Sequence, residues 1–577
     1  QNFVNHVLVG ADGKPRARWQ FLMPRTNAVA ILVRPRPGLT QTQIERLVSA
    51  VSRTVADAKL PTSRTTISGV PAVVSGLGRE IRHEAPILAA AAAVAVSAWF
   101  FFVPWTRRRH RLLPVLATGC GTAVTLALAG WSGRPLALTA VAFLPVLLGI
   151  GSDFTAYLHK AVPRRIVVAS AVASIAGFGS LGFTAIPAVA DLGISLAIGL
   201  TISVLVSLAL VDRFAPAPTV VESAARRSLS ERAARGTAIA LVLAAIGGWF
   251  LSPHLPMQAD FKSLASGLSA YSNAEHVASI LGADGEVTIQ VRAVNVLTPQ
   301  IYDWLQEVNS SLSGPETTAL RPVLSAPEML GFLGASPTVG QLASAMRLLP
   351  AYVTKAAISA DHTDALLIYG VRLRSAQELA SMRARINPAI ANPPPGVTAS
   401  VGGLPMVAVS ARSAFGERTW LTAALGILAA SLGAGLVLRR RVAVLAGLSA
   451  AITYGVASAV TYVLSVPLTP LTAGLGSLTA AVACEFTIVL AYARQTGRAS
   501  VTRAVALAAA ASATGYVVLM FSSLGPVRGF GALLGATVAL SLVVSKIVVA
   551  AFVKQPNRDV PTDDQMTVPP AKVEVRV

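Results

Sequence analysis

Residues 149–155 read Gly-Ile-Gly-Ser-Asp-Phe-Thr, and residues 484–488, which read Cys-Glu-Phe-Thr-Ile, place a second acid-Phe-Thr triplet in the other half of the chain. Both stretches lie inside long apolar runs, so Asp153 and Glu485 are acids in surroundings that hold few other charges. An ionisable group inside a membrane costs ~2.5 kcal/mol or more, and it therefore marks a functional site by default. The duplicated acid predicts a membrane protein built from two related halves.

The composition also indicates a membrane protein. Of the 577 residues, 53% are hydrophobic and 13% are charged, whereas soluble proteins carry ~25% charged residues. The mean hydropathy is +0.62. Because ~20 helical residues cross the hydrocarbon of a bilayer, apolar runs of about that length predict a polytopic α-helical membrane protein. We expect eleven spans, at residues 86–104, 112–130, 136–158, 166–184, 190–212, 236–252, 419–438, 442–466, 468–493, 501–523 and 529–553.

The net charge of +21 is concentrated in alternate loops. Basic clusters follow the first and seventh spans, at Arg107–Arg111 and Arg439–Arg441, and further clusters occupy every second loop. This alternation follows the positive-inside rule, so these loops and the C-terminus are predicted to be cytoplasmic. Residues 1–85 and 253–418 are then extracytoplasmic. A nucleic-acid partner is not expected, because no basic stripe runs through a folded soluble domain.

An internal repeat of about 335 residues connects the two halves. Gly69-Val70-Pro71 precedes the first span as Gly403-Leu404-Pro405 precedes the seventh. The acid-Phe-Thr triplets follow in order, and then residues 183–193 match 521–531 through a Phe and a Gly. Since both halves face the same way, the repeat is parallel, about an axis along the membrane normal.

The soluble segments read as small α+β modules. Strands are expected at 29–34 and 64–70 with a helix at 42–58 between them. In the second half, strands at 286–293, 364–372 and 397–403 alternate with helices at 298–312 and 375–390, which suggests ferredoxin-like domains. The predicted divisions are a partial porter domain at 1–85, spans at 86–213, a cytoplasmic linker at 214–235, a span at 236–252, a second porter domain at 253–418, spans at 419–553 and a cytoplasmic tail at 554–577.

The two acids are candidates for proton coupling. A desolvated carboxyl group can hold a proton near neutral pH, and if the third and ninth spans meet at the axis, Asp153 and Glu485 would titrate as a coupled pair. The alternative is a buried acid with a permanent Lys or Arg partner, but no basic residue lies inside either helix. Tyr157, one turn after Asp153 on the same helix face, can hydrogen-bond to it.

The neighbours of the acids suit a close helix interface. Gly149 and Gly151 permit close helix approach. Thr155 and Thr487 can instead bond to carbonyls of their own helices. The histidines are dispersed, no HExxH or CxxC spacing occurs, and no phosphate-binding loop is present, so we expect no metal, no cofactor and no enzymatic activity. Cys120 and Cys484 both lie in predicted spans and read as small core residues.

The duplicated motif resembles the paired helix motifs of the resistance–nodulation–division (RND) superfamily. Residues 149–155 and 484–488, with Tyr492 and Arg494 following, are most similar to its MMPL and hydrophobe/amphiphile efflux branches, and residues 10–15 ahead of a strand are similar too. The resemblance implies twelve spans in two six-helix halves, each with a porter domain after its first span. This chain would then hold spans two to twelve, which would also explain how its first segment, beginning at Gln1, leaves the cytoplasm.

The resemblance also implies a function. Such proteins couple proton influx to export of lipids or other hydrophobic compounds, and their coupling residues map onto Asp153 and Glu485. The chain departs from the MMPL pattern at Phe154 and Phe486, where hydroxyl-bearing tyrosines are usual. We therefore expect a transporter in the cytoplasmic membrane of a bacterium, with protons and a lipid or hydrophobic small molecule as partners. The alternatives are a non-transporting lipid or sterol sensor, an assembly scaffold, or a SecDF-like translocation helper.

Overall fold

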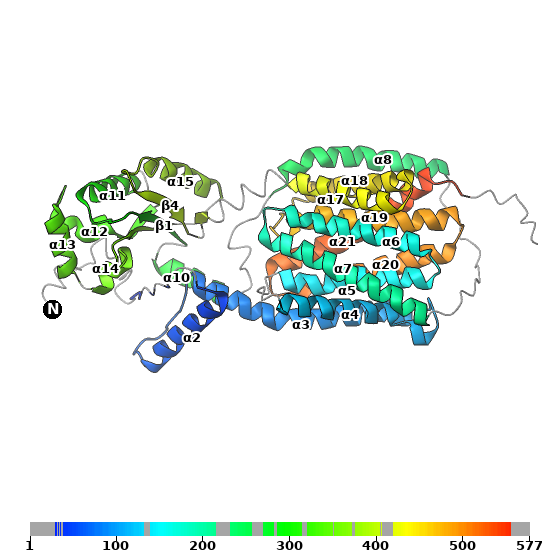
Figure 1. The fold of residues 1–577 in the computed structure, drawn as a ribbon, viewed down its shortest axis with the longest axis horizontal. Helices are drawn as coiled ribbons and strands as arrows, with labels where there is room; N and C mark the ends of the chain where they lie inside the picture. The colour runs from blue at the N-terminus through cyan, green and yellow to red at the C-terminus, as the bar shows by residue number, and fades with distance from the viewer. Residues whose placement is uncertain are drawn as a thin grey trace, which may run out of the picture.

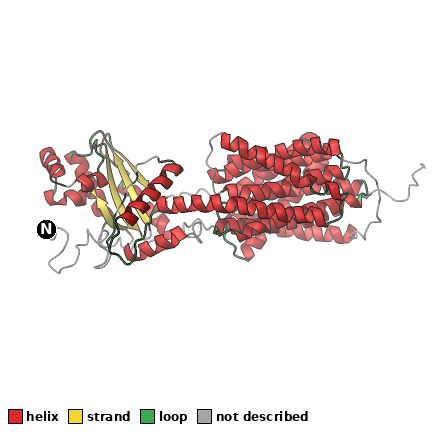
Figure 2. Ribbon diagram, turned by 90° about the horizontal axis from the view of Figure 1, so that it is seen from below, coloured by secondary structure: helices red, strands yellow, loops and turns green. Residues whose placement is uncertain are grey.

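The structure, a computed structural model, describes residues 29–31, 33, 35, 39–131, 139–214, 231–256, 269–281, 285–313, 320–349, 351–371, 376–403, 405–406 and 419–555. The motif at 10–15, most of the linker at 214–235 and most of the tail at 554–577 lie outside these residues. The described part consists of a helical bundle and, beyond one end of it, a smaller α+β domain (Figures 1 and 2).

Eleven described helices are long and apolar enough to cross a membrane, which confirms the predicted number of spans. They are α3 (Val70–Phe102), α4 (Leu113–Trp131), α5 (Thr139–His159), α6 (Arg164–Gly179), α7 (Pro187–Phe214), α8 (Glu231–Leu251), α17 (Thr419–Val437), α18 (Arg440–Val463), α19 (Leu475–Gln495), α20 (Ala499–Val517) and α21 (Gly525–Phe552).

Helix α3 begins well before the predicted span at 86–104. Gly69, with a φ of +107°, breaks the chain direction, and a proline stands at the start of the helix, where its missing N–H costs nothing. Pro86 lies inside the helix without ending it. As a result, α3 projects from the bundle toward α2 (Gln41–Asp57) as one continuous rod (Figure 1).

The two halves of the internal repeat share details of backbone conformation and helix packing. Gly403 has a φ of +113°, close to that of Gly69. Short 3-10 helices continue α6 and α20 at equivalent places, η3 (Ser180–Phe183) and η7 (Val518–Phe521). A Cβ on Gly193 would lie 2.4 Å from the Leu181 Cβ, and a Cβ on Gly531 would lie 2.5 Å from the equivalent Leu519 Cβ. The two halves therefore use the same helix contacts at the same positions.

The halves are also interleaved. Helix α5 of the first half packs against α20 of the second, and α19 of the second packs against α6 of the first. Helix α3 contacts α20 as α17 contacts α6. A twofold axis along the bundle produces this exchange of neighbouring helices. Helices α5 and α19 lie at the centre of the bundle, since 94% of the most apolar stretch of each helix is buried.

The α+β domain formed by described residues of 285–406, which we predicted as the second porter domain, has the expected ferredoxin-like sheet. Its strands are β1 (Gly285–Arg292), β2 (Leu320–Ser325), β3 (Asp364–Val371) and β4 (Thr398–Gly402), paired antiparallel in the order β2-β3-β1-β4. Helices α11 (Pro299–Leu312) and α15 (Ala376–Ala389) follow β1 and β3, close to the predicted positions. Strand β2 and the helices α12 (Ala326–Leu330), α13 (Val339–Leu348) and α14 (Ala351–Ala357) were not predicted.

The first soluble segment differs from the prediction. Helix α2 is present, but the described residues of 29–34 and 64–69 form no strand, so the two predicted strands are wrong there. A strand needs a neighbour to satisfy its backbone groups, and Val29 and Ile31 are 79% and 78% exposed, with no strand beside them among the residues that the structure describes. Nearby, α10 (Ser269–Leu281) contacts α3.

Candidate functional site

The two acids lie in the centre of the bundle. Asp153 on α5 is 1% exposed and Glu485 on α19 is fully buried. Neither forms an ion pair with any residue that the structure describes. The alternative of a permanent Lys or Arg partner therefore finds no support, and hydrogen-bond donors have to stabilise any negative charge at the site.

Each acid accepts a hydrogen bond from a serine of the opposite half. Ser512 on α20 donates to Asp153, with Oγ 3.4 Å from Oδ2 and 3.5 Å from Oδ1. Ser174 on α6 donates to Glu485 Oε2 over 3.2 Å. The two serines are as far apart in sequence as Gly193 and Gly531, so they are equivalent in the repeat. We did not predict them, although comparing polar residues at this spacing would have revealed the pair.

Tyr157 bonds to a different partner from the one predicted. Its Oη donates to Glu485 Oε1 over 3.1 Å, so the acid that it serves is that of the other half rather than Asp153 one turn away. The spacing of four residues gives the helix face correctly, but the long phenol reaches past its own helix to α19. Val489 occupies the equivalent position of the second half and has no donor.

The threonines of the two motifs make a matched pair of contacts. Thr155 Oγ1 lies 2.7 Å from Ser207 Oγ on α7, and Thr487 Oγ1 lies 2.9 Å from Ser545 Oγ on α21. Thr487 also donates to the carbonyl of Ala483 over 2.7 Å, the bond within its own helix that we expected. These contacts bind each central helix to the last helix of its own half.

Close packing surrounds the acids. Phe154 and Phe486 are fully buried in one apolar cluster, and the Phe154 ring packs edge-on against Tyr157, with 6.2 Å between the ring centroids. A Cβ on Gly149 would lie 2.9 Å from the Tyr516 ring on α20, and one on Gly151 would lie 2.6 Å from Thr118 on α4. Because a Cβ does not fit, these glycines permit α5 to approach α20 and α4 closely.

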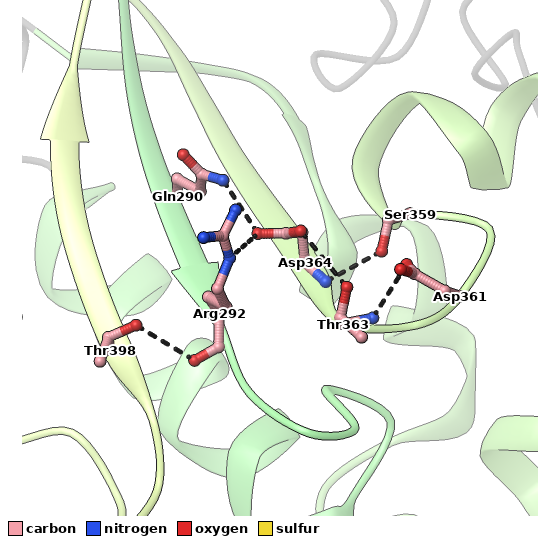
Figure 3. A network of polar contacts seen from close by, with 7 residues as sticks. All are labelled: Gln290, Arg292, Ser359, Asp361, Thr363, Asp364 and Thr398. Carbon is pink, nitrogen blue, oxygen red and sulfur yellow. Dashed lines mark hydrogen bonds and ion pairs between the residues drawn. The ribbon is translucent and has the colours of Figure 1, made fainter. Parts of the chain in front are cut away.

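A second polar network lies in the α+β domain, at the start of β3 (Figure 3). Asp364 Oδ1 accepts from Gln290 Nε2 over 2.9 Å and from Arg292 Nε over 3.0 Å, both on β1. Burial opposes ionisation of Asp364, but these hydrogen bonds and the Arg292 charge together outweigh it and hold its pKa below the usual value. The network joins β1 to β3 beside the turn that contains Asp361 and Thr363, and we read it as structural.

Among the described residues, no group of three His, Cys, Asp or Glu side chains could hold a metal ion. His110 and His159 stack edge-on at the end of α5, with 5.8 Å between ring centroids, and Thr106 Oγ1 lies 2.5 Å from His159 Nε2. The candidate functional site is thus formed by the two buried acids with their serine and tyrosine donors.

No protein-family profile matches the chain, and no curated protein matches it. Solved structures do. The hedgehog release protein Disp from the water bear Hypsibius dujardini is 11% identical, over 82% of this chain and 70% of its own, with a TM-score of 0.52. SecDF, a translocon-associated membrane protein from Thermus thermophilus, is 14% identical, over 90% of this chain and 68% of its own, with a TM-score of 0.48.

At these identities the likeness concerns the fold alone. The similarity to Disp, together with the eleven apolar helices and the antiparallel sheet, shows the fold of RND-type polytopic membrane proteins. The predicted fold class is thereby confirmed.

Proposed function

We propose that this chain is a proton-driven transporter that moves a lipid or another hydrophobic or amphiphilic compound out of the cytoplasmic membrane. The observation that carries the proposal is the exchange of donors: Ser512 of the second half bonds to Asp153, and Ser174 of the first half bonds to Glu485. The charge of each acid is thus linked to a contact between the two halves.

This arrangement supplies a mechanism for coupling. An ionised carboxylate only accepts hydrogen bonds, whereas a protonated one also donates, and bonds to the ionised form are the stronger. Protonation of Asp153 or Glu485 therefore weakens the hydrogen bond between that acid and the serine of the opposite half. Since the two halves pack through these helices, a change in their mutual affinity shifts the balance between two arrangements of the bundle.

The direction and the substrate class rest on the resemblance to efflux proteins and on the ferredoxin-like domain. In the proposed cycle, a proton from the extracytoplasmic side binds to the pair and is released inside. The accompanying movement is transmitted along α3 and the other helices to the porter domains, which receive the amphiphile. The charge placement in the loops sets this orientation.

Flux in proteoliposomes tests the proposal. The full chain, reconstituted with a fluorescent phospholipid as probe, should move it under an imposed proton gradient and stop when a protonophore is added. Asp153→Asn and Glu485→Gln should each abolish this flux, because an amide can neither carry the negative charge of the pair nor take up and release its proton. Asp191→Asn is the matched control, since Asp191 is an exposed acid near the start of α7.

Wild-type flux in both acid variants would refute the relay. A chain that binds the probe but moves none under any gradient would instead be a sensor or an assembly scaffold. Gradient-dependent movement of an unfolded polypeptide, with no lipid flux, would favour a translocation helper.

A further inference from the structure

The two carboxylates receive unequal support. Each oxygen of Glu485 has a donor, the Tyr157 hydroxyl at 3.1 Å and the Ser174 hydroxyl at 3.2 Å. Ser174 shares its proton with the Ala481 carbonyl at 3.3 Å, so Tyr157 is the donor that serves Glu485 alone.

Asp153 shares the Ser512 hydroxyl between its two oxygens, at 3.4 and 3.5 Å. Ser152 is its other hydroxyl neighbour, but that hydroxyl donates to the Gly149 carbonyl over 2.7 Å. Hydrogen bonds between oxygens are usually ~2.7–2.8 Å long, so the longer bonds to Asp153 stabilise its ionised form less than those to Glu485 do.

One position of the repeat causes this inequality. The serine donors and the Thr155–Ser207 and Thr487–Ser545 contacts occur in both halves. The phenol does not, because Val489 stands where the second half would need a tyrosine to serve Asp153. The second buried phenol of the site, Tyr516, is bonded to the Val146 carbonyl instead, over 3.5 Å.

We propose that Tyr157 makes the pair unequal, so that Asp153 binds and releases the transported proton while Glu485 remains the anionic member. The assignment rests on the proposed function. The two acids interact electrostatically, and Tyr157, from the helix of Asp153, reaches Glu485. Donors that bond to an ionised carboxylate favour its ionised form, so of two acids that titrate together the one with weaker donors takes up the proton. Tyr157 acts here as a positioning residue, bonded to one acid from the helix of the other.

Few other titratable or charged groups lie near Asp153 and Glu485 among the described residues. The titratable groups around the pair are Tyr157, Tyr516 and the buried thiol of Cys484, which precedes Glu485 in the chain. Lys546, in the last quarter of α21, is exposed. Arg165, Asp191 and Arg503 lie near helix ends, and Glu84 in the middle of the long helix α3 is bonded to Ser522 and Ser523, just before α21.

Carbodiimide labelling of the purified full chain tests the assignment. Dicyclohexylcarbodiimide modifies protonated carboxyl groups in apolar surroundings, and peptide mass spectrometry measures the modification of Asp153 and Glu485 across a pH series. The expected result is that Asp153 remains reactive to a higher pH than Glu485. Tyr157→Phe should raise the labelling midpoint of Glu485 by roughly one pH unit, the loss of one hydrogen bond to a charged group.

Two further variants control the result. Tyr516→Phe removes a phenol from the same buried region and should leave the Glu485 midpoint unchanged. Ser174→Ala removes the other donor to Glu485 and should raise its midpoint as Tyr157→Phe does, which keeps the test valid if the tyrosine variant does not fold. Equal midpoints for the two acids in the wild type, or a Glu485 midpoint that neither Tyr157→Phe nor Ser174→Ala moves, would overturn the assignment.

Labelling needs no transport, so the two proposals can fail separately. Equal midpoints together with gradient-driven flux that Asp153→Asn abolishes would overturn only the assignment of roles. Unequal midpoints in a chain that shows no proton-dependent flux would overturn the proposed function and leave the inequality of the acids in place.

Discussion

A substitution at Gly531 tests the repeated helix contact from which the bundle geometry follows. In Gly531→Ala, the added Cβ would lie 2.5 Å from the Leu519 Cβ and 2.6 Å from the Tyr516 carbonyl oxygen. Non-bonded carbon atoms prefer ~3.5–4.0 Å. The Tyr516 carbonyl belongs to the backbone at the end of α20 and cannot rotate away, so α21 has to move from α20.

The magnitude follows from two opposing effects. Overpacking a well-packed site costs typically ~1–3 kcal/mol, while alanine in place of glycine inside a helix contributes up to ~1 kcal/mol in favour of folding. We therefore expect Gly531→Ala to destabilise the chain by roughly 1–2 kcal/mol. Gly529, two residues away on the same helix, has no heavy atom within 4 Å of an added Cβ, so Gly529→Ala keeps only the favourable effect.

Thermal unfolding of the full chain in detergent, followed by tryptophan fluorescence, measures the difference. Gly531→Ala should unfold at a lower temperature than the wild type, and Gly529→Ala at the same or a higher one. Gly193→Ala should behave like Gly531→Ala, because its Cβ would lie 2.4 Å from Leu181 Cβ. A Gly531→Ala chain as stable as Gly529→Ala would refute the packing on which the equivalence of the halves depends.

Two further predictions concern polar contacts outside the central site. Glu84 on α3 accepts from Ser522 Oγ over 2.6 Å and from the Ser523 amide over 2.7 Å, just before α21; Glu84→Gln should lower the apparent Tm by the equivalent of ~1 kcal/mol, and an unchanged Tm would contradict this. Asp364→Asn should speed amide hydrogen exchange in β3 at pH 6. The free energy of opening should fall by less than ~1 kcal/mol, because Arg292 is largely exposed. The pKa of Asp364 is lowered in the folded chain. The stability that Asp364 contributes is therefore fully present above its usual pKa of ~3.9 and is lost as the pH falls through its lowered pKa. A difference between variant and wild type in exchange rates corrected for pH that persists below that lowered pKa would count against the ion pair.

Local patterns were enough to predict much of this protein. Hydrophobic runs predicted the eleven spans, because a helix that crosses a bilayer has to be long and apolar whatever its neighbours are. The alternation of β1 and β3 and the helical pattern of α11 and α15 were equally local, and they predicted most elements of the α+β domain. The parallel repeat and the two acids came from comparing the chain with itself.

Prediction failed where the outcome depended on a partner far away in the sequence. The apolar residues at 29–34 read as a strand, but a strand exists only when another supplies its hydrogen bonds, and none lies beside Val29 or Ile31 in the described chain. Strand β2 was missed for the converse reason: Leu320–Ser325 is short and contains a proline, and it is a strand because β3 pairs with it.

The site shows the same division. The sequence by itself determined that Asp153 and Glu485 would be buried and equivalent, because their apolar helices leave no alternative. Only the tertiary structure decided that each acid is served by the opposite half, and that Tyr157 bonds to Glu485 rather than to Asp153 one turn before it. Spacing along a helix determines which face a side chain occupies, but the helix that lies against that face is determined by the packing of the whole bundle.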